Sequence, residues 1–307
     1  MARYIINRLF SMITTLLIIS SITFFLMHSI PGGPFASERE LTPEVEAILM
    51  ERYGLDLPLS QQYFNYMTGI VQGDLGVSMT KTGIEVSDII LQGLPTSAKV
   101  GLVAIGVILL LGIPIGIVSA LKQNTILDHI VMFIATIGIA VPSFVIGTFI
   151  MYVGGEVLGV IPAGGLNEWR GYIGPVIALS GFSLAYVTRL MRSSMLEILR
   201  QDYIRTAKAN GLSHFKVIYK HALKNALIPV ITYVGPMIAS ILTGSFVVEK
   251  IFALPGMGRY FTDSITNRDY TVIMGITLFY ATIYIVMVLI VDIAYAFVDP
   301  RIKIDER

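Results

Sequence analysis

The residues of this chain that could do chemistry are few, and they lie apart from one another. The four histidines form no cluster along the sequence, and the absence of cysteine removes thiolate ligands and thiol nucleophiles. The sequence contains no Gly-x4-Gly-Lys-Ser/Thr phosphate loop, no His-Glu-x2-His pair and no Gly-x-Ser-x-Gly nucleophile motif. We therefore predict no catalytic residue, no metal site and no cofactor held by this chain, and do not expect it to be an enzyme.

A charged segment in the second half of the chain has the pattern of a short helix that ends at a glycine. Asp202 is a suitable N-cap, and Gly211 can take the left-handed conformation that stops a helix without a Cβ clash. Two interpretations stay open, a solvated basic loop or a knob that docks into a partner, and the small side chains favour the knob. The candidate docking residues are Asp202, Tyr203, Ile204, Arg205, Thr206, Ala207, Lys208, Ala209, Asn210, Gly211, Leu212 and Ser213.

A second helix is predicted from Ser213, as its N-cap, to about Asn225. Three lysines repeat along it at intervals of four residues, a spacing that places like charges on one face. Apolar and aromatic residues occupy the opposite face, so this helix suits the surface of an anionic membrane. The predicted apolar face consists of Phe215, Ile218, Tyr219 and Ala222, and the lysines are Lys216, Lys220 and Lys224.

The composition indicates a membrane protein. Of 307 residues, 54% are hydrophobic and only 14% are charged, whereas a soluble domain carries about 25% charged residues. The formal net charge of +1 gives no sign of a nucleic-acid-binding surface.

Six stretches are apolar and long enough to cross a membrane, which takes roughly 20 helical residues for about 30 Å of hydrocarbon. The first lies within residues 1–30 and exceeds the apolar core of a signal peptide, so we expect it to be retained. Internal prolines such as Pro114 and Pro142 are compatible with membrane helices, because neighbouring helices satisfy the freed carbonyls. The other predicted helices are about 97–121, 130–155, 172–192, 226–248 and 270–294.

The lysines and arginines set the expected orientation. With a cytoplasmic N-terminus, 14 of the 22 basic residues fall inside, eight of them between residues 189 and 224. We therefore predict a multi-pass protein of the cell membrane with both termini in the cytoplasm. The predicted regions are the first transmembrane helix (1–30), an acidic extracytoplasmic loop (31–95), a core transmembrane domain (96–299) that includes a cytoplasmic loop (193–225), and a cytoplasmic tail (300–307).

Polar side chains along the fifth predicted span have two interpretations. They can line a path for a solute, or they can pack helices together as small polar residues do in membranes. The candidate pathway residues are Thr232, Tyr233, Ser240 and Thr243.

The segment 205–211 resembles the EAA loop of ABC importer permeases, whose pattern is Glu-Ala-Ala, three residues, glycine, nine residues and Ile-x-Leu-Pro. Ala207, Gly211 and Leu223 match the second alanine, the glycine and the leucine of that pattern. The positions that depart from it are Arg205, Thr206, His221 and Lys224.

The rest of the chain resembles the dipeptide, oligopeptide and nickel permeases of binding-protein-dependent transport systems. The resemblance covers nearly the whole chain, and the long outer loop favours the first, B-type, of two paired permease subunits. The matching blocks are Pro31–Phe35, Tyr53–Asp56 with Pro58–Leu59, Gly73–Gly76, Val141–Phe144, His221–Pro229, Gly244–Phe252, Leu254–Gly258, Asn267–Tyr270 and Asp299–Arg301.

This resemblance implies an all-α integral membrane fold, a six-helix type I ABC importer permease with a long extracytoplasmic loop after helix 1. It implies that residues 202–213 couple transport to separate ATPase subunits, which hold ATP and Mg. The implied partners are a second permease subunit, two ATPase subunits, an extracytoplasmic solute-binding protein, a peptide substrate and membrane lipid, and no nucleic acid.

Three other functions stay open. The same architecture could import nickel or another small solute. An ion-coupled secondary transporter would be expected to contain inverted repeats with broken helices and buried acids near the midplane, and none is apparent in the sequence. A membrane-embedded enzyme would need a nucleophile–base pair or a metal constellation, which the sequence does not offer.

Overall fold

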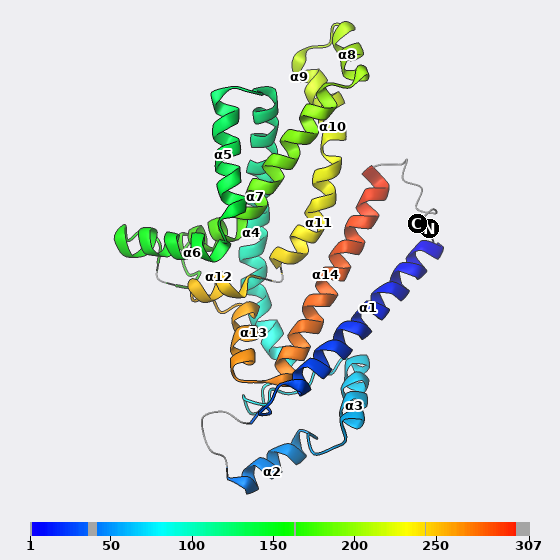
Figure 1. Cartoon of the computed structure of the whole chain (residues 1–307), viewed down its shortest axis with the longest axis vertical. Helices are drawn as coiled ribbons and strands as arrows, with labels where there is room; N and C mark the ends of the chain where they lie inside the picture. Colours follow the sequence, from blue (N-terminus) through cyan, green and yellow to red (C-terminus); the bar gives the residue numbers. More distant parts are fainter. Residues whose placement is uncertain (1, 36–41, 163, 243, 299–307) are drawn as a thin grey trace. The chain divides into compact units, whose positions relative to one another are not determined.

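The computed structural model describes residues 2–35, 42–162, 164–242 and 244–298, and regular structure in these ranges is helical (Figure 1). Extended backbone pairs there only at an isolated bridge between Val77 and Glu85. The predicted all-α class is confirmed. The tail 300–307 and Thr243 lie outside the described residues.

The chain divides into two compact units. Unit 1 comprises Met1–Ser97 and Pro255–Val286, and unit 2 comprises Ala98–Leu254 and Met287–Arg307. Unit 1 contains α1 (Ala2–Ser29), α2 (Pro43–Arg52), α3 (Leu59–Gln72) and α13 (Met257–Thr266). Unit 2 contains α5 (Ile126–Ala140), α6 (Ser143–Ile150), the π-helix η1 (Met151–Val157), α7 (Arg170–Leu199), α8 (Asp202–Ala209), α9 (His214–Lys216), the π-helix η2 (Val217–Ala222), α10 (Leu223–Ala226), α11 (Ile228–Leu242) and α12 (Phe246–Ile251). The boundary between the units falls within α4 (Val86–Leu121) and α14 (Tyr270–Val298).

Five helical segments of the described chain are long and apolar enough to cross a membrane, and a bent pair of helices makes a sixth if it counts as one span. This agrees with the predicted six-helix fold. The continuous segments are Ile6–Ser29, Val86–Leu121, Arg170–Leu199, Ile228–Ile251 and Tyr270–Ile290, and the bent pair is Ile126–Ala140 with Ser143–Val157.

The predicted helix at 130–155 is not continuous, because the chain bends by 102° between α5 and α6. Pro142 lacks an N–H and disfavours helical backbone at the residue before it, and Val141 is accordingly extended, with φ −90° and ψ 123°. Pro236, in contrast, lies inside the continuous helix α11. The sequence identified Pro142 but not the size of the bend, which depends on what α6 packs against.

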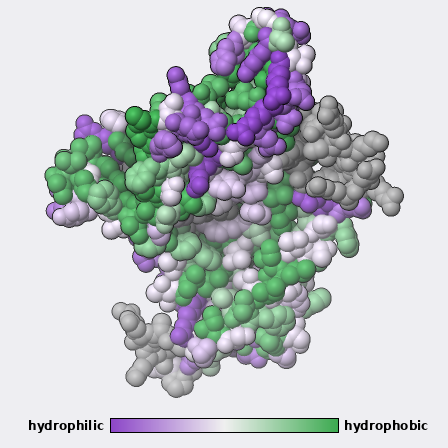
Figure 2. Space-filling model, turned by 45° about the horizontal axis from the view of Figure 1, so that its top comes forward, coloured by the Kyte–Doolittle hydropathy of each residue, from purple (hydrophilic) through white to green (hydrophobic). Residues whose placement is uncertain are grey.

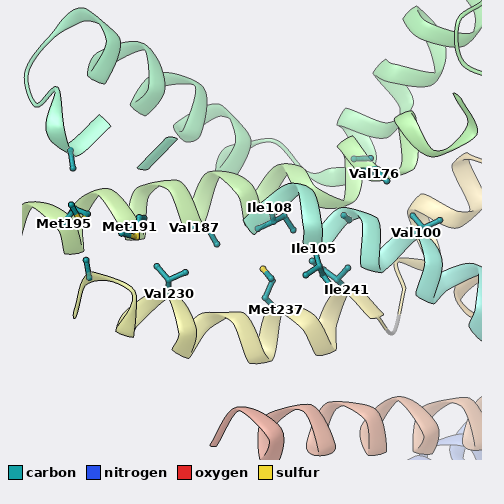
Figure 3. Close-up of a cluster of buried hydrophobic side chains, with 14 of the residues drawn as sticks. Val100, Ile105, Ile108, Val176, Val187, Met191, Met195, Val230, Met237 and Ile241 are labelled. Carbon is teal, nitrogen blue, oxygen red and sulfur yellow. The ribbon is translucent and has the colours of Figure 1, made fainter. Parts of the chain in front are cut away.

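The core of unit 2 forms where α7 packs with α4 and α11. Figure 3 shows Val230 and Met237 of α11 directed toward α7, and Ile105 and Ile108 of α4 in the same cluster. These side chains are almost wholly buried, and Met191 of α7 is buried completely. α7 is therefore the central helix of this unit, and its candidate span is half buried, against 11% for α1.

Two glycines four residues apart let α4 approach α7 closely. A Cβ on Gly116 would lie 2.7 Å from the carbonyl oxygen of Thr188, and one on Gly112 would lie 3.0 Å from Val187 Cγ1. Small residues at this spacing are typical of helix packing in membranes, where van der Waals contact rather than the hydrophobic effect holds helices together. The approach of α4 to α7 therefore needs glycine at position 116.

The surface is divided by polarity. Figure 2 shows hydrophilic side chains gathered at the end of unit 2 that carries α8, and hydrophobic side chains over the helices beyond it. Large apolar residues on the candidate spans are highly exposed in the isolated chain, among them Phe10, Leu110 and Phe133 at 72%, 75% and 67%. This is the pattern of helices that contact lipid or other membrane helices.

In unit 1, the first turns of α4 extend beyond the predicted span. α4 begins at Val86 rather than near residue 97, and its Ile89 and Ile90 pack in a buried cluster with Met257 of α13 and Ile276 of α14. The sequence did not reveal these turns as part of the span because Asp88 and other polar residues lower their hydropathy.

A buried carboxylate fastens the segment around residue 79 to the start of α14. Asp269 is 1% exposed and accepts hydrogen bonds from Ser78 Oγ at 2.5 Å, Thr80 Oγ1 at 2.9 Å and the Met79 N–H at 3.1 Å. It also caps α14 by accepting from the Val272 N–H at 3.2 Å. The loop before α4 is thereby held to α14.

Candidate coupling surface

The predicted short helix is present as α8, Asp202–Ala209, but its predicted N-cap is wrong. Gln201 holds the cap position, in an extended conformation with φ −70° and ψ 149°, and no side chain caps the helix. Asp202 is the first helical residue, and its side chain is 96% exposed, 3.5 Å from Arg205. The chain turns between Leu199, the last residue of α7, and Asp202, the first residue of α8. The N-cap is therefore Gln201, one residue before the predicted Asp202.

The predicted stop at Gly211 is confirmed. Its φ is +75°, its N–H donates to the Lys208 carbonyl at 3.0 Å, and the Leu212 N–H donates to the Ala207 carbonyl at 3.4 Å. These two bonds form a Schellman motif. A Cβ on Gly211 would meet no atom of this chain within 4 Å. A larger residue there would face only the backbone cost of the left-handed conformation, about 1 kcal/mol.

α8 has one face buried in its own chain. Ile204 and Ala207 are 0% and 6% exposed and belong to the same apolar cluster as Val217 and Ala222 of η2, which are fully buried. Ala207, a candidate docking residue, therefore supports α8 from beneath and does not lie on the outer surface. The exposed members of the predicted set are Asp202, Tyr203, Arg205, Thr206, Lys208, Ala209, Asn210, Gly211 and Ser213, and Leu212 is half-buried.

The second predicted helix is interrupted by the π-helix η2, which divides its predicted apolar face. Ala222 is buried within the chain, whereas Phe215 and Tyr219 are 76% and 67% exposed, with their rings stacked 5.9 Å apart. The i→i+5 bonds of a π-helix turn side chains away from α-helical positions. The three lysines are exposed, as predicted. Asn225 donates from its side-chain amide to the Tyr203 hydroxyl at 2.8 Å, which ties α8 to the chain just before α11.

An ion pair that sequence reasoning missed holds α7 near this surface. Arg192 donates to both carboxylate oxygens of Asp128, at 2.6 and 2.7 Å, and Asp128 also accepts from Ser119 Oγ at 2.6 Å and the Asn124 N–H at 2.9 Å. Asp128 is 2% exposed. The pair joins the first turn of α5 to α7, close before α8. The available signal was Asp128, the single acid between Asp88 and Glu156, but the sequence offered both Arg189 and Arg192 as its partner.

The three described candidate pathway residues do not share one face of α11. Thr232 and Ser240 lie on the exposed face of α11. Tyr233 points toward α7, where its hydroxyl donates to Ser183 Oγ at 3.2 Å and its ring lies 4.4 Å from that of Tyr186. Thr243 lies outside the described residues.

Comparison with known families places this architecture in one class. Residues 112–304 match the family described as "Binding-protein-dependent transport system inner membrane component", and residues 1–100 match "Binding-prot-dependent transport system membrane comp, N-term". The chain therefore belongs to the inner-membrane permease subunits of binding-protein-dependent transport systems. The predicted family is confirmed, and this class is a transport subunit of the membrane rather than an enzyme or a self-contained secondary transporter.

The relatives are peptide permeases. The chain is 47% identical over 307 residues to the dipeptide transport system permease protein DppB of Bacillus subtilis, covering 100% of both chains. It is 45% identical over 304 residues to DppB of Lactococcus lactis, covering 99% of this chain and 100% of that one. It is 40% identical over 305 residues to the oligopeptide transport system permease protein OppB of Escherichia coli K12, again covering 99% and 100%.

Two solved transporters share the fold. The inward-facing MetNI methionine ABC transporter aligns with a TM-score of 0.53 at 15% identity, over 69% of this chain and 96% of that chain. An amino acid ABC transporter with histidines aligns with a TM-score of 0.51 at 20% identity, over 70% and 95%. At these identities the similarity establishes the fold alone.

Proposed function

We propose that this chain forms half of the translocation pathway of an ATP-driven importer for dipeptides or oligopeptides in the cell membrane. Relatives that match over the whole chain carry dipeptide or oligopeptide in their names, which favours a peptide over nickel or another small solute. Both termini and α8 would lie in the cytoplasm, and residues 31–95 outside. The tail 300–307 would be cytoplasmic, and residues 96–299 would form the core permease domain.

The observation that carries this proposal is the way α8 is mounted. Its outer face is exposed, while Ile204 and Ala207 fix its inner face against η2. η2 continues through α10 into the apolar helix α11, and α8 follows α7 after a short turn. A displacement of α8 by a partner would therefore move the cytoplasmic ends of two membrane helices. This is the connection that a coupling element needs.

The partners follow from what this chain lacks. ATP and Mg would be held by two separate ATPase subunits that dock on α8, since the sequence has no phosphate loop. A second permease subunit would complete the pathway, for which the exposed face of α11 with Thr232 and Ser240 offers one wall. A solute-binding protein would deliver the peptide from outside.

Gly211→Leu tests the coupling role, with Gly159→Leu as its matched control. Both glycines have positive φ, +75° and +63°, and a Cβ added at either position would meet no atom of this chain within 4 Å. The backbone cost is thus the same, about 1 kcal/mol. We expect Gly211→Leu to keep normal membrane levels but to lose ATPase co-purification or at least tenfold of peptide uptake, because the side chain would enter a closely packed contact.

The control should retain both activities. Full uptake with Gly211→Leu would mean that α8 is not the coupling element. Equal losses in both variants would assign the effect to backbone strain.

A further inference from the structure

Unit 1 contains a cavity of about 210 Å³ that the proposed function does not yet use. Its walls come from α1, the turn after α2, α3, the segment 74–79 and the start of α14. The floor is apolar and aromatic, since Phe24, Tyr270 and Met274 are at most 5% exposed. Asn65 and Asp74 are exposed and form the rim.

Two polar residues in the wall are fully engaged within the chain. His28 has Nδ1 2.8 Å from the Phe24 carbonyl oxygen and Nε2 3.0 Å from Gln62 Oε1. Gln62 also donates from Nε2 to the carbonyl oxygens of Leu55 and Leu57, at 3.1 and 2.8 Å. These contacts brace the cavity between α1 and α3. They leave neither side chain available to a ligand.

One polar group in the wall, the Tyr66 hydroxyl, is buried with no hydrogen bond among the described residues. At the exposed rim, one carboxylate oxygen of Asp74 accepts from the Gly76 N–H at 2.8 Å. Asn65 also lines the cavity, and both rim side chains are open to a ligand. Burial raises the pKa of the Tyr66 phenol, and the nearby Tyr63 adds to the shift, so the hydroxyl stays neutral. A buried polar group without a partner costs about 1–3 kcal/mol, which a ligand could recover.

Charge and size indicate what would fit. Residues 42–91 carry seven acidic and only two basic side chains, which favours a cation. Pockets for drug-sized molecules are about 300–1,000 Å³, so this cavity suits a single side chain rather than a whole peptide. A guanidinium matches the wall better than an ammonium, because it is weakly hydrated, stacks on aromatic rings and donates several hydrogen bonds in one plane.

We propose that this cavity receives an arginine side chain of the extracytoplasmic solute-binding protein. The guanidinium would pass Asp74 and Asn65 at the rim and end against the Tyr66 hydroxyl and the aromatic floor. Asp74 would balance its charge, without which burying a cation is costly. This inference rests on the proposed function, since it needs unit 1 to face the binding protein.

The experiment measures the Kd of the assembled transporter for its peptide-loaded binding protein. We expect Asp74→Asn and Tyr66→Phe each to raise the Kd at least tenfold. Glu44→Gln is the control, because Glu44 is exposed on α2 and is not part of the cavity wall, and it should change the Kd less than twofold. Tyr66→Phe should also raise the Tm of the free permease, because it removes a buried hydroxyl without a partner.

Replacing each surface arginine of the binding protein by alanine should then identify one whose loss is not additive with Asp74→Asn. Unchanged affinity with Asp74→Asn and Tyr66→Phe, in a transporter that still imports peptide, would overturn the arginine site and leave the proposed function intact. If a surface lysine of the binding protein, rather than an arginine, were non-additive with Asp74→Asn when replaced by alanine, the guanidinium assignment would be overturned. Failure of the wild-type transporter to bind any binding protein would overturn the proposed function itself.

Discussion

The two units each hold neighbouring segments together with a buried aspartate, but the carboxylate has different partners in each. In unit 2, Asp128 forms an ion pair with Arg192 and so holds α7 just before the candidate coupling surface. In unit 1, Asp269 has no ion-pair partner among the described residues and instead accepts hydrogen bonds from neutral donors around Ser78 and Thr80. Asp128 therefore depends on a cation in addition to two neutral donors, whereas all the described donors to Asp269 are neutral.

Removing the cation of the pair should have the largest effect. Arg192→Met leaves Asp128 as a buried charge with only Ser119 and the Asn124 N–H as partners, and breaking such a pair costs about 3–5 kcal/mol. We expect a clear drop in the Tm of the purified transporter and partial loss of bound ATPase. Arg189→Met, on an exposed position of α7, should change the Tm little.

The double variant Asp128→Asn with Arg192→Met sharpens this test, because it leaves no uncompensated charge. It should recover part of the lost stability. If Arg192→Met and Arg189→Met lowered the Tm equally, the ion pair would not hold α7, and the contrast with Asp269 would fail.

The next effect concerns the two faces of α8. Ala207→Glu places a charge in an apolar cluster, so α8 should lift from η2 at a local cost of about 2–3 kcal/mol. Ala209→Glu makes the same change on the exposed face and should leave the helix docked. Hydrogen exchange of the α8 amides measures the difference. Faster exchange in both variants would show that α8 is not held through Ala207.

Ala209→Glu also separates folding from partner contact. With normal exchange, it should still reduce ATPase co-purification, because the charge lies on the surface proposed for docking. If the ATPase co-purified normally with both Ala207→Glu and Ala209→Glu, α8 would not be part of the proposed ATPase contact.

Asp269→Asn should have a smaller effect, confined to unit 1. The asparagine keeps one acceptor oxygen but turns an amide toward donors near Ser78 and Thr80, and losing a hydrogen bond to a charged group costs about 1.5–3 kcal/mol. We expect faster tryptic cleavage at Lys81 and weaker stimulation by the binding protein, with the ATPase still bound. Asp263→Asn is the control, because it removes only an exposed ion pair with Arg259. Trypsin should cleave this variant at the wild-type rate.

The smallest effect is expected at the start of α8. An N-cap loss would cost about 1 kcal/mol, but Asp202 makes only an exposed pair with Arg205, for which about 0.5 kcal/mol or less is typical. Asp202→Ala should therefore leave the Tm almost unchanged. Ser245→Ala removes an observed cap on the Val248 N–H and should lower it measurably. A larger loss for Asp202→Ala than for Ser245→Ala would restore Asp202 as the cap.

The sequence by itself determined the features that depend on local chemistry or on composition over a long window. Apolar length predicted the membrane helices, because every backbone group in lipid must be satisfied within a helix. The glycine at 211 predicted the end of α8, because its left-handed backbone strongly favours that residue. The motif blocks predicted the family.

Only the tertiary structure decided what depends on packing between distant segments. The pairing of Asp128 with Arg192 and of Asp269 with Ser78 joins residues far apart along the chain, and no local pattern specifies such partners. The chain bends by 102° at Pro142, whereas α11 continues through Pro236. A proline alone therefore does not predict the size of a bend. Ala207 is buried because η2 lies beneath it, and the cavity near Tyr66 exists because α1, α3 and α14 meet without filling the space between them.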